Sequence, residues 1–308
     1  MVFFSVIIPT YNRANLIEKT VDSVLNQDYR DREIIIVDDG SKDNTLDVLK
    51  KYKNQVRVLR QNNQGAGAAR NLGLKFANGQ YITFLDSDDL WFPWTLNTYK
   101  KVILDTNFPA FVAGKELNFF NEQEILSVSQ SQLEVTLYND YYASAYEDIW
   151  IGTCSTAIKK DTLDQVGGYC NQNINAEDSD LWLRLGNAKG FVYINSPYLF
   201  AYRRHEQSEV SNLDKSYQGK LYIINKEKTQ QYSGGKERKR ERLYIITRHT
   251  RSMSFACLKQ GEIQKGWRIY QNTFFWNLRL IRVRYLLGFL LITTKKILEL
   301  LIKKISLK

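Results

Sequence analysis

The chain of 308 residues has few cysteines and lacks long uncharged apolar runs. Its three cysteines, Cys154, Cys170 and Cys257, are odd in number and follow no metal-ligand spacing. This argues against a disulfide framework and indicates a reducing compartment. In the apolar C-terminal segment the longest uncharged stretch is ten residues, 285–294, whereas a membrane-spanning helix needs about 20. The apolar N-terminus lacks a basic flank and runs into Pro9, which favours a buried strand over a signal peptide. We therefore predict a cytoplasmic protein without a membrane span.

Acidic residues are scarce in the last third of the chain. Residues 215–308 hold 22 Lys/Arg and 5 Asp/Glu, a net charge of +17, and residues 1–214 carry the remaining −7 of the overall +10. A basic region on an acidic body predicts an anionic partner. Its basic residues alternate with leucines instead of forming an aromatic stacking platform, which favours an anionic membrane surface over nucleic acid.

The first hundred residues alternate short apolar runs with helical patterns, which predicts an α/β fold with a mostly parallel sheet flanked by helices. Later segments are more mixed, and beyond residue 211 the chain reads as helical and basic. We predict two domains, 1–212 and 213–308. The expected strands are 5–9, 33–37, 56–59, 81–85, 111–113, 149–158 and 191–202, and the expected helices are 16–25, 45–52, 67–77 and 177–185.

Polar residues follow three of these predicted strands. They are Thr10-Tyr11-Asn12, Asp38-Asp39-Gly40-Ser41 and Asp86-Ser87-Asp88-Asp89. In open parallel sheets, ligands bind outside the carboxyl ends of the strands. The three strand ends therefore predict one binding site.

The acidic turn 86–89 is the strongest candidate for a metal site. Close carboxylates repel one another unless a cation lies between them. Oxygen ligands suit Mg²⁺ or Mn²⁺, which typically bind one or two carboxylates together with substrate phosphates. The alternative is a solvated acidic turn; its place beside two other polar strand ends favours the metal.

Other candidate residues are less specific. One of Asp38 and Asp39 is placed to contact a nucleoside, and Arg70 lies in a run of small residues that opens a helix, where it could meet a phosphate or a base. The run lacks the glycines of the dinucleotide-binding fingerprint and of the P-loop, which argues against a dehydrogenase. Glu177 and Asp178 fit a helix start, where acidic residues are common for structural reasons alone. His205 is either a metal or phosphate ligand or a surface residue.

Together these segments resemble the inverting glycosyltransferases of family 2, which share the GT-A fold. The resemblance covers about residues 3–210 and rests on five short motifs in the family's order. They are Val6-Ile7-Ile8-Pro9-Thr10-Tyr11-Asn12-Arg13, Val37-Asp38-Asp39-Gly40-Ser41, Gly67-Ala68-Ala69-Arg70-Asn71-Leu72-Gly73, Asp86-Ser87-Asp88-Asp89 and Glu177-Asp178.

The resemblance implies a role for each matching residue. Asp178 would be the catalytic base, with Glu177 beside it, and Asp86 and Asp88 would bind Mn²⁺ or Mg²⁺. Arg204, His205 and Ser208 match a looser pattern associated with the diphosphate, and His205 is a further candidate metal ligand. The nucleotide pocket would be formed by Pro9, Thr10, Tyr11, Asp39, Arg70 and Asp86.

The implied reaction transfers a hexose from a nucleoside diphosphate-sugar, with UDP the expected nucleotide, to a hydroxyl of a glycan or lipid-linked acceptor. It would be a single displacement assisted by the metal. The basic C-terminal region would lie on the inner face of the cell membrane or form a homo-oligomer contact. Two alternatives remain open: a nucleotidyltransferase that makes sugar nucleotides, and a non-catalytic membrane-associated binding protein.

Overall fold

The computed structural model describes the backbone of residues 2–204 and 212–306. Its contacts divide the chain into two compact units. The first comprises residues 1–173 and 177–208, and the second comprises 174–176 and 209–308. The predicted boundary falls at 212/213, whereas this division falls at 208/209, and no sequence pattern indicated that residues 174–176 belong to the second unit.

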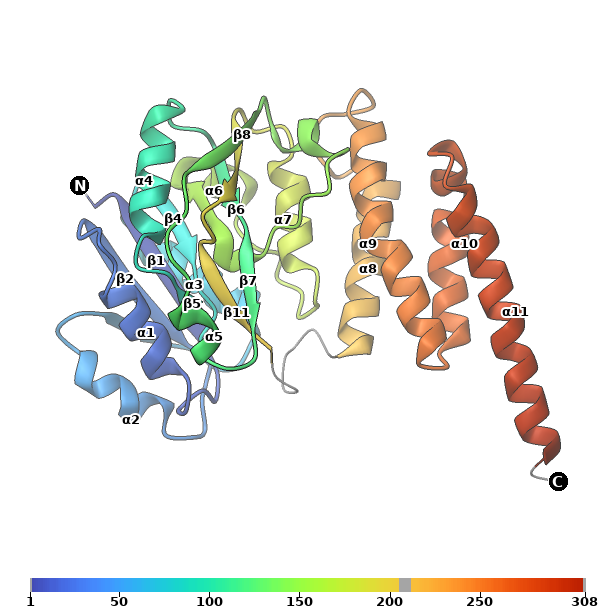
Figure 1. Cartoon of the computed structure of the whole chain (residues 1–308), viewed down its shortest axis with the longest axis horizontal. Coiled ribbons are helices and arrows are strands. Elements are labelled where there is room, and N and C mark those ends of the chain that lie inside the picture. Colours follow the sequence, from blue (N-terminus) through green and yellow to red (C-terminus); the bar gives the residue numbers. More distant parts are fainter. Residues whose placement is uncertain (1, 205–211, 307–308) are drawn as a thin grey trace. The chain divides into compact units, whose positions relative to one another are not determined.

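An eight-stranded sheet organises the first unit, in the order β3-β2-β1-β4-β9-β6-β10-β8 (Figure 1). Strands β3, β2, β1 and β4 run parallel, as does the pair β6–β10. Strand β9 is antiparallel to both of its neighbours, and β8 is antiparallel to β10. The strands are β1 Phe4–Thr10, β2 Arg32–Asp38, β3 Arg57–Arg60, β4 Tyr81–Phe84, β6 Phe111–Gly114, β8 Glu134–Tyr138, β9 Thr156–Lys159 and β10 Phe191–Ser196.

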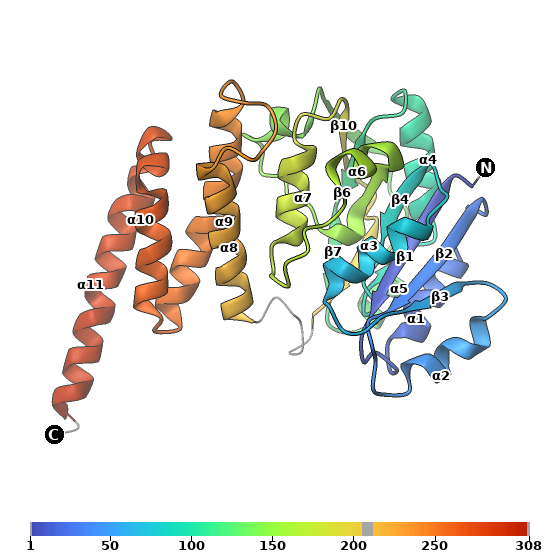
Figure 2. The ribbon, with the colours of Figure 1, turned by 180° about the vertical axis from the view of Figure 1, so that it is seen from behind.

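Helices cover both faces of this sheet, as Figures 1 and 2 show from opposite sides. Apolar residues of α1 and α4 pack on one face against Phe4, Val6 and Ile8 of β1. On the other face α3 lies so close to β1 that Gly73 could not carry a Cβ without meeting Ile7. The helices are α1 Ile17–Leu25, α2 Thr45–Leu49, α3 Ala66–Phe76, α4 Thr95–Asp105, α5 Gln123–Leu126, α6 Lys160–Val166 and α7 Glu177–Leu185, with 3₁₀ turns at Lys50–Tyr52, Tyr141–Ser144 and Thr153–Ser155.

A second sheet of three strands was not predicted. It has the order β5-β11-β7, formed by Leu90–Trp91, Phe200–Arg203 and Glu116–Phe119. The single strand predicted at 191–202 is wrong, because the chain leaves the large sheet after Ser196, passes through Pro197 and enters the small one as β11. Proline cannot donate a ladder hydrogen bond and so tends to end a central strand.

The predicted strand 149–158 is also wrong over most of its length, because only its end belongs to β9. The Ser155 hydroxyl donates to the carbonyl of Gly152, and the Thr156 hydroxyl donates to that of Thr153. Such side-chain bonds favour a turn over an extended ladder. The segment between β7 and β8 contains the short helix α5.

The second unit is helical, as predicted. Helix α9 packs against α8 and α10, and α11 packs against α9 and α10. Its core is rich in aromatic residues, including Tyr270, Tyr285 and Phe289. Within the described part of the chain, no helix is long and apolar enough to cross a membrane. The four helices are α8 Leu213–Lys228, α9 Lys239–Lys259, α10 Ile263–Arg279 and α11 Val283–Ser306.

Candidate active site

The ends of three neighbouring parallel strands meet at one edge of the sheet, as predicted from their polar residues. Pro9 and Thr10 are buried at the end of β1, and the Thr10 hydroxyl has no hydrogen-bond partner among the residues that the structure describes. The next residue, Tyr11, is partly exposed. The Asn12 N–H donates to the Ser41 hydroxyl at 2.9 Å and so ties the first strand end to the second. Thr10 and Tyr11 therefore lie where a nucleotide pocket was expected.

The acidic turn follows β4 and is held by arginines. Arg13 contacts Asp88, with Nη2 3.2 Å from Oδ2. Arg70 contacts Asp86, with Nη2 2.6 Å from Oδ1. Asp89 is buried beneath the turn; burial, with the nearby Asp88 and Asp86 charges, raises its pKa well above the usual range. Asp89 therefore has a structural role inside the turn, whereas the side chains of Asp86 and Asp88 are partly exposed to solvent.

Arg70 joins this turn to the pair Glu177-Asp178. Its side chain is only 5 % exposed, and its Nη1 lies 3.3 Å from Oε1 of Glu177. Burial alone would lower the pKa of Arg70, but Asp86, Tyr169 and Glu177 together raise it well above the ordinary value. One permanently charged guanidinium therefore links residues separated by some ninety positions in sequence. The sequence placed Arg70 near the ligand but did not predict this bridge.

The predicted catalytic pair begins helix α7, as expected. Asp178 is half-buried, and its Oδ1 accepts the Ser179 N–H at 2.5 Å. Burial raises the pKa of Glu177, which Arg70 counteracts and Asp178 reinforces. A Cβ on Gly67 of α3 would come within 3.8 Å of the Glu177 Cβ, so the small residues of α3 allow this close approach. Arg70 therefore connects this pair to the acidic turn, because it contacts both Glu177 and Asp86.

Asp39 has a local structural role in addition to its predicted contact with the base. Its Oδ1 accepts the Gln61 side-chain N–H at 2.7 Å and the Gln64 N–H at 2.9 Å, and its Oδ2 accepts the Gly65 N–H at 2.8 Å. These bonds fix the loop that leads into α3. Asp39 and Arg70 are therefore coupled through the start of one helix.

The end of β11 contributes Arg203, which sequence reasoning missed. Its backbone N–H donates to Oδ1 of Asp89 at 2.9 Å, and its Nε donates to the carbonyl of Asp88 at 2.9 Å. Arg204 instead donates through Nε to Asn118 at 2.7 Å. The position of Arg203 directly after the predicted strand 191–202 was a signal, but the adjacent Arg204 lies almost equally close to that strand end. The predicted His205 and Ser208 lie outside the described residues.

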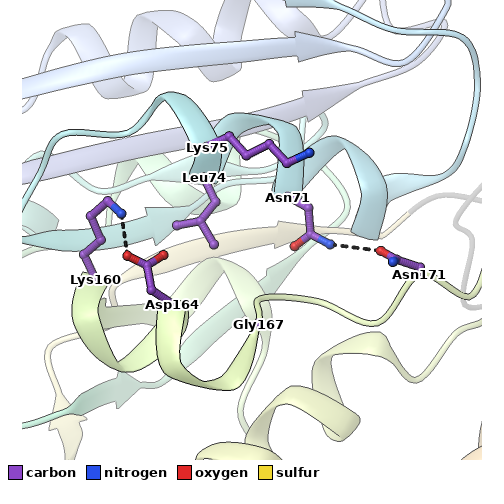
Figure 3. A pocket seen from close by; sticks show the side chains of 7 residues that line it. All are labelled: Asn71, Leu74, Lys75, Lys160, Asp164, Gly167 and Asn171. Atoms are coloured by element: carbon purple, nitrogen blue, oxygen red, sulfur yellow. Dashed lines mark hydrogen bonds and ion pairs between the residues drawn. The ribbon is translucent and has the colours of Figure 1, made fainter.

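A cavity of about 320 Å³ is lined by residues of α3, of α6 and of the loop that follows α6 (Figure 3). It contains none of the predicted site residues. Above it Asn71 donates to the carbonyl of Tyr169 at 2.9 Å and accepts the Tyr169 N–H at 2.8 Å, which holds the loop before α7. The cavity is lined by Asn71, Leu74, Lys75, Lys160, Asp164, Gly167 and Asn171.

The donor chemistry of the turn fits a hard divalent ion. Ligand atoms of Asp86, Asp89 and Cys154 lie within 4.8 Å of one another, and Asp88 is a further carboxylate of the same turn. Burial and the nearby Asp86 and Asp89 charges raise the pKa of Cys154 well above the usual range, and a soft sulfur ligand suits Mn²⁺ or Mg²⁺ less well than oxygen does. Oxygen atoms of Asp86 and Asp88 remain, and these suit Mn²⁺ or Mg²⁺.

The sequence matches a protein-family model and is similar to known proteins. A model described as "Glycosyl transferase family 2" matches residues 5–161. The UDP-Glc:alpha-D-GlcNAc-diphosphoundecaprenol beta-1,3-glucosyltransferase WfaP of Escherichia coli is 35% identical over 217 residues, which are 68% of this chain and 80% of that protein.

Two solved structures are similar in fold. TarS residues 1–349 from S. aureus, in complex with UDP-GlcNAc, has a TM-score of 0.64 at 21% identity over 82% of this chain and 73% of that one. The mannosyltransferase PcManGT from Pyrobaculum calidifontis, in complex with GDP-Man and Mn²⁺, has a TM-score of 0.56 at 17% identity over 95% of this chain and 86% of that one. These likenesses confirm the predicted GT-A fold.

Proposed function

The chain is a glycosyltransferase of family 2, and on this premise we propose that it transfers a hexose from a UDP-sugar to an acceptor hydroxyl with inversion. The observation that supports this most is the Arg70 bridge, because it joins the acidic turn at Asp86 to the pair Glu177-Asp178. A leaving-group site and a proton acceptor must lie on opposite sides of the same sugar carbon in a single displacement. The bridge holds the acidic turn near the pair, which supports a site where both act on one bound sugar.

In the proposed reaction Asp178 accepts the proton of the acceptor hydroxyl. The acceptor oxygen forms a bond to the anomeric carbon while the bond from that carbon to the diphosphate oxygen breaks, and UDP leaves with the electron pair. Arg70 keeps its charge throughout and holds Glu177 beside the reacting sugar. Arg13 orients Asp88 in the acidic turn.

Asp86 and Asp88 would hold the divalent ion. When bound, Mn²⁺ or Mg²⁺ would offset the negative charge of the diphosphate. Thr10, Tyr11 and Asp39 are proposed to contact the nucleoside, and Arg204 to act near the diphosphate, with His205 as a further candidate ligand.

The choice of donor and acceptor rests on the E. coli relative. Its name specifies UDP-Glc as the donor and a diphosphoundecaprenol-linked sugar as the acceptor. We propose a UDP-hexose and a lipid-linked or glycan acceptor for this chain as well. A lipid-linked acceptor is presented at a membrane, and the net charge of +17 in residues 215–308 is consistent with a peripheral place on an anionic, cytoplasmic membrane face.

The test incubates the protein with a panel of nucleotide-sugars and Mn²⁺, with and without EDTA, and identifies the released nucleotide. We expect slow release of UDP from one UDP-hexose, and loss of that release when EDTA removes the metal. Release of pyrophosphate from a nucleoside triphosphate and a sugar phosphate would identify the alternative nucleotidyltransferase. Binding without any turnover on the panel or with added lipid-linked acceptors would favour the non-catalytic alternative.

A further inference from the structure

Figure 1 shows the turn that joins α10 to α11. Its apolar side chains are exposed and its backbone is strained. Ile281 has φ of 55°, in the left-handed region, and is 80% exposed. A β-branched residue is an outlier there, whereas glycine or asparagine adopts this conformation readily. Phe275 is 76% exposed, and Leu278 and Val283 are exposed as well. Because the same isoleucine is both strained and exposed, its side chain is a candidate for contact with a partner.

Near this turn, three arginine side chains make cation–π contacts with two tyrosine rings. The guanidinium of Arg282 lies 4.1 Å from the centre of the Tyr244 ring, and that of Arg248 lies 5.9 Å from the same ring. Arg251 lies 6.0 Å from the centre of the Tyr285 ring. Helix α9 supplies Arg248 and Arg251, while Arg282 directly follows Ile281. We call these three residues the arginine cluster.

The arginine cluster concentrates positive charge, and each of its three arginines is only partly buried. Within the described part of the chain, the buried Nε and Nη2 of Arg282 have no hydrogen-bond partner. The pKa of Arg251 is lowered by burial and by Arg282, with a smaller effect from Arg248. Burial, Lys220 and Arg248 lower the pKa of His249 to about 3. Phosphate oxygens would offset this positive charge and accept hydrogen bonds from the exposed parts of the guanidinium groups, because guanidinium forks match phosphate geometry.

We propose that the α10–α11 turn docks on an anionic lipid surface, where Ile281 and Phe275 enter the interface and the arginine cluster binds headgroup phosphates. A free phosphate would explain the arginines but not the strained, exposed isoleucine. The apolar surface also continues along α11 through Leu287, Leu291 and Leu298, all exposed, as in helices that lie in the plane of a membrane. This inference rests on the proposed function, because docking would hold the enzyme beside a lipid-linked acceptor.

The test measures co-sedimentation of the full chain with vesicles of phosphatidylcholine alone and of phosphatidylcholine mixed with phosphatidylglycerol. We expect binding only to the mixed vesicles. Arg251→Gln and Arg282→Gln should each weaken binding about fivefold. The matched control is Lys259→Gln, which removes one positive charge from the exposed C-terminal end of α9 and should have a smaller effect. Equal losses for all three variants would overturn the arginine cluster as the headgroup site.

Ile281→Asn separates docking from folding. Asparagine tolerates positive φ, so this variant should be at least as stable as the parent yet bind mixed vesicles about tenfold more weakly. Leu126→Asn, at an 82% exposed position in α5, should leave binding unchanged. Undiminished binding by Ile281→Asn would overturn the proposal.

Two further outcomes would also count against docking on anionic lipid. Displacement by millimolar inorganic phosphate would identify a site for free phosphate. A lipid-independent dimer that dissociates in Ile281→Asn would identify a contact between copies. The measurement needs neither donor nor acceptor: lipid binding without turnover on the nucleotide-sugar panel would reject the proposed function alone, and turnover without lipid binding would reject this inference alone.

Discussion

Arg70 is buried between two carboxylates, and removing it should cost both stability and activity. In Arg70→Met the carboxylates of Asp86 and Glu177 lose their shared cation, and breaking such a buried pair typically costs about 3–5 kcal/mol. The measurement is urea unfolding alongside UDP release. Arg70→Lys should recover part of the stability but little of the activity, because an ammonium group cannot bridge two carboxylates in the same way.

The control for Arg70 is Lys101→Met. Lys101 pairs with Asp105 on the surface of α4, where both side chains are more than half exposed. Such pairs contribute about 0–1 kcal/mol. An Arg70→Met protein that unfolds at the same urea concentration as Lys101→Met would show that the bridge does not stabilise the unit.

Sequence motifs identified several candidate site residues but did not predict the contacts between them. The sequence identified Asp86, Asp88 and Asp178 through motifs that depend on local chain order. It could not show that Arg70 contacts Asp86 and Glu177 together, because that contact depends on how α3 packs. Arg203 and Arg204 are adjacent and chemically identical, so only the course of β11 shows that Arg203 meets the acidic turn. The roles of Asp178 and of the metal ligands stay predictions.

Helix α3 depends on close packing against β1. In Gly73→Ala the new Cβ would lie 2.5 Å from Cγ2 of Ile7, which is fully buried in the central strand. Overpacking of this kind costs about 1–3 kcal/mol, whereas alanine gains up to about 1 kcal/mol in helix propensity. We expect a net loss of stability, measured by thermal unfolding, and a lower rate of UDP release because Arg70 lies on the same helix.

Gly288→Ala is the matched control for Gly73→Ala. Apart from the helix's own nearby backbone, no described residue has an atom within 4 Å of a Cβ added at Gly288 in α11. The change should therefore be neutral or stabilising by up to about 1 kcal/mol. Stabilisation of both variants would contradict the close packing of α3 on β1.

Elements with a strong local pattern were predicted well. Helix α7 has the predicted bounds, and strands β1 and β2 extend the predicted ranges by one residue at each end. Failures occurred where tertiary contacts decided the outcome. Residues 191–202 are apolar almost throughout, and their pattern does not show that Pro197 separates strands of two different sheets.

At the scale of the whole molecule, charge and chemistry are divided along the chain. Residues 215–308 carry a net charge of +17, and the remainder carries −7. The acidic turn and Glu177-Asp178 belong to the first unit, and the arginine cluster belongs to the second. From the net charge we expect an anionic partner for the second unit, and this expectation stays a prediction. Net charge could not locate the proposed docking surface, since the position of Arg282 over Tyr244 depends on the packing of α9 against α11.

The most direct test of the proposed reaction is Asp178→Asn, assayed with the UDP-hexose and acceptor that give turnover. Asparagine has nearly the same shape as aspartate but cannot accept the proton. We expect kcat to fall about 10²–10⁴-fold, while the Kd for the UDP-sugar, measured by calorimetry with Mn²⁺, stays close to that of the parent. Full turnover by Asp178→Asn would contradict the assignment of Asp178 as the base, and with it the proposed single displacement.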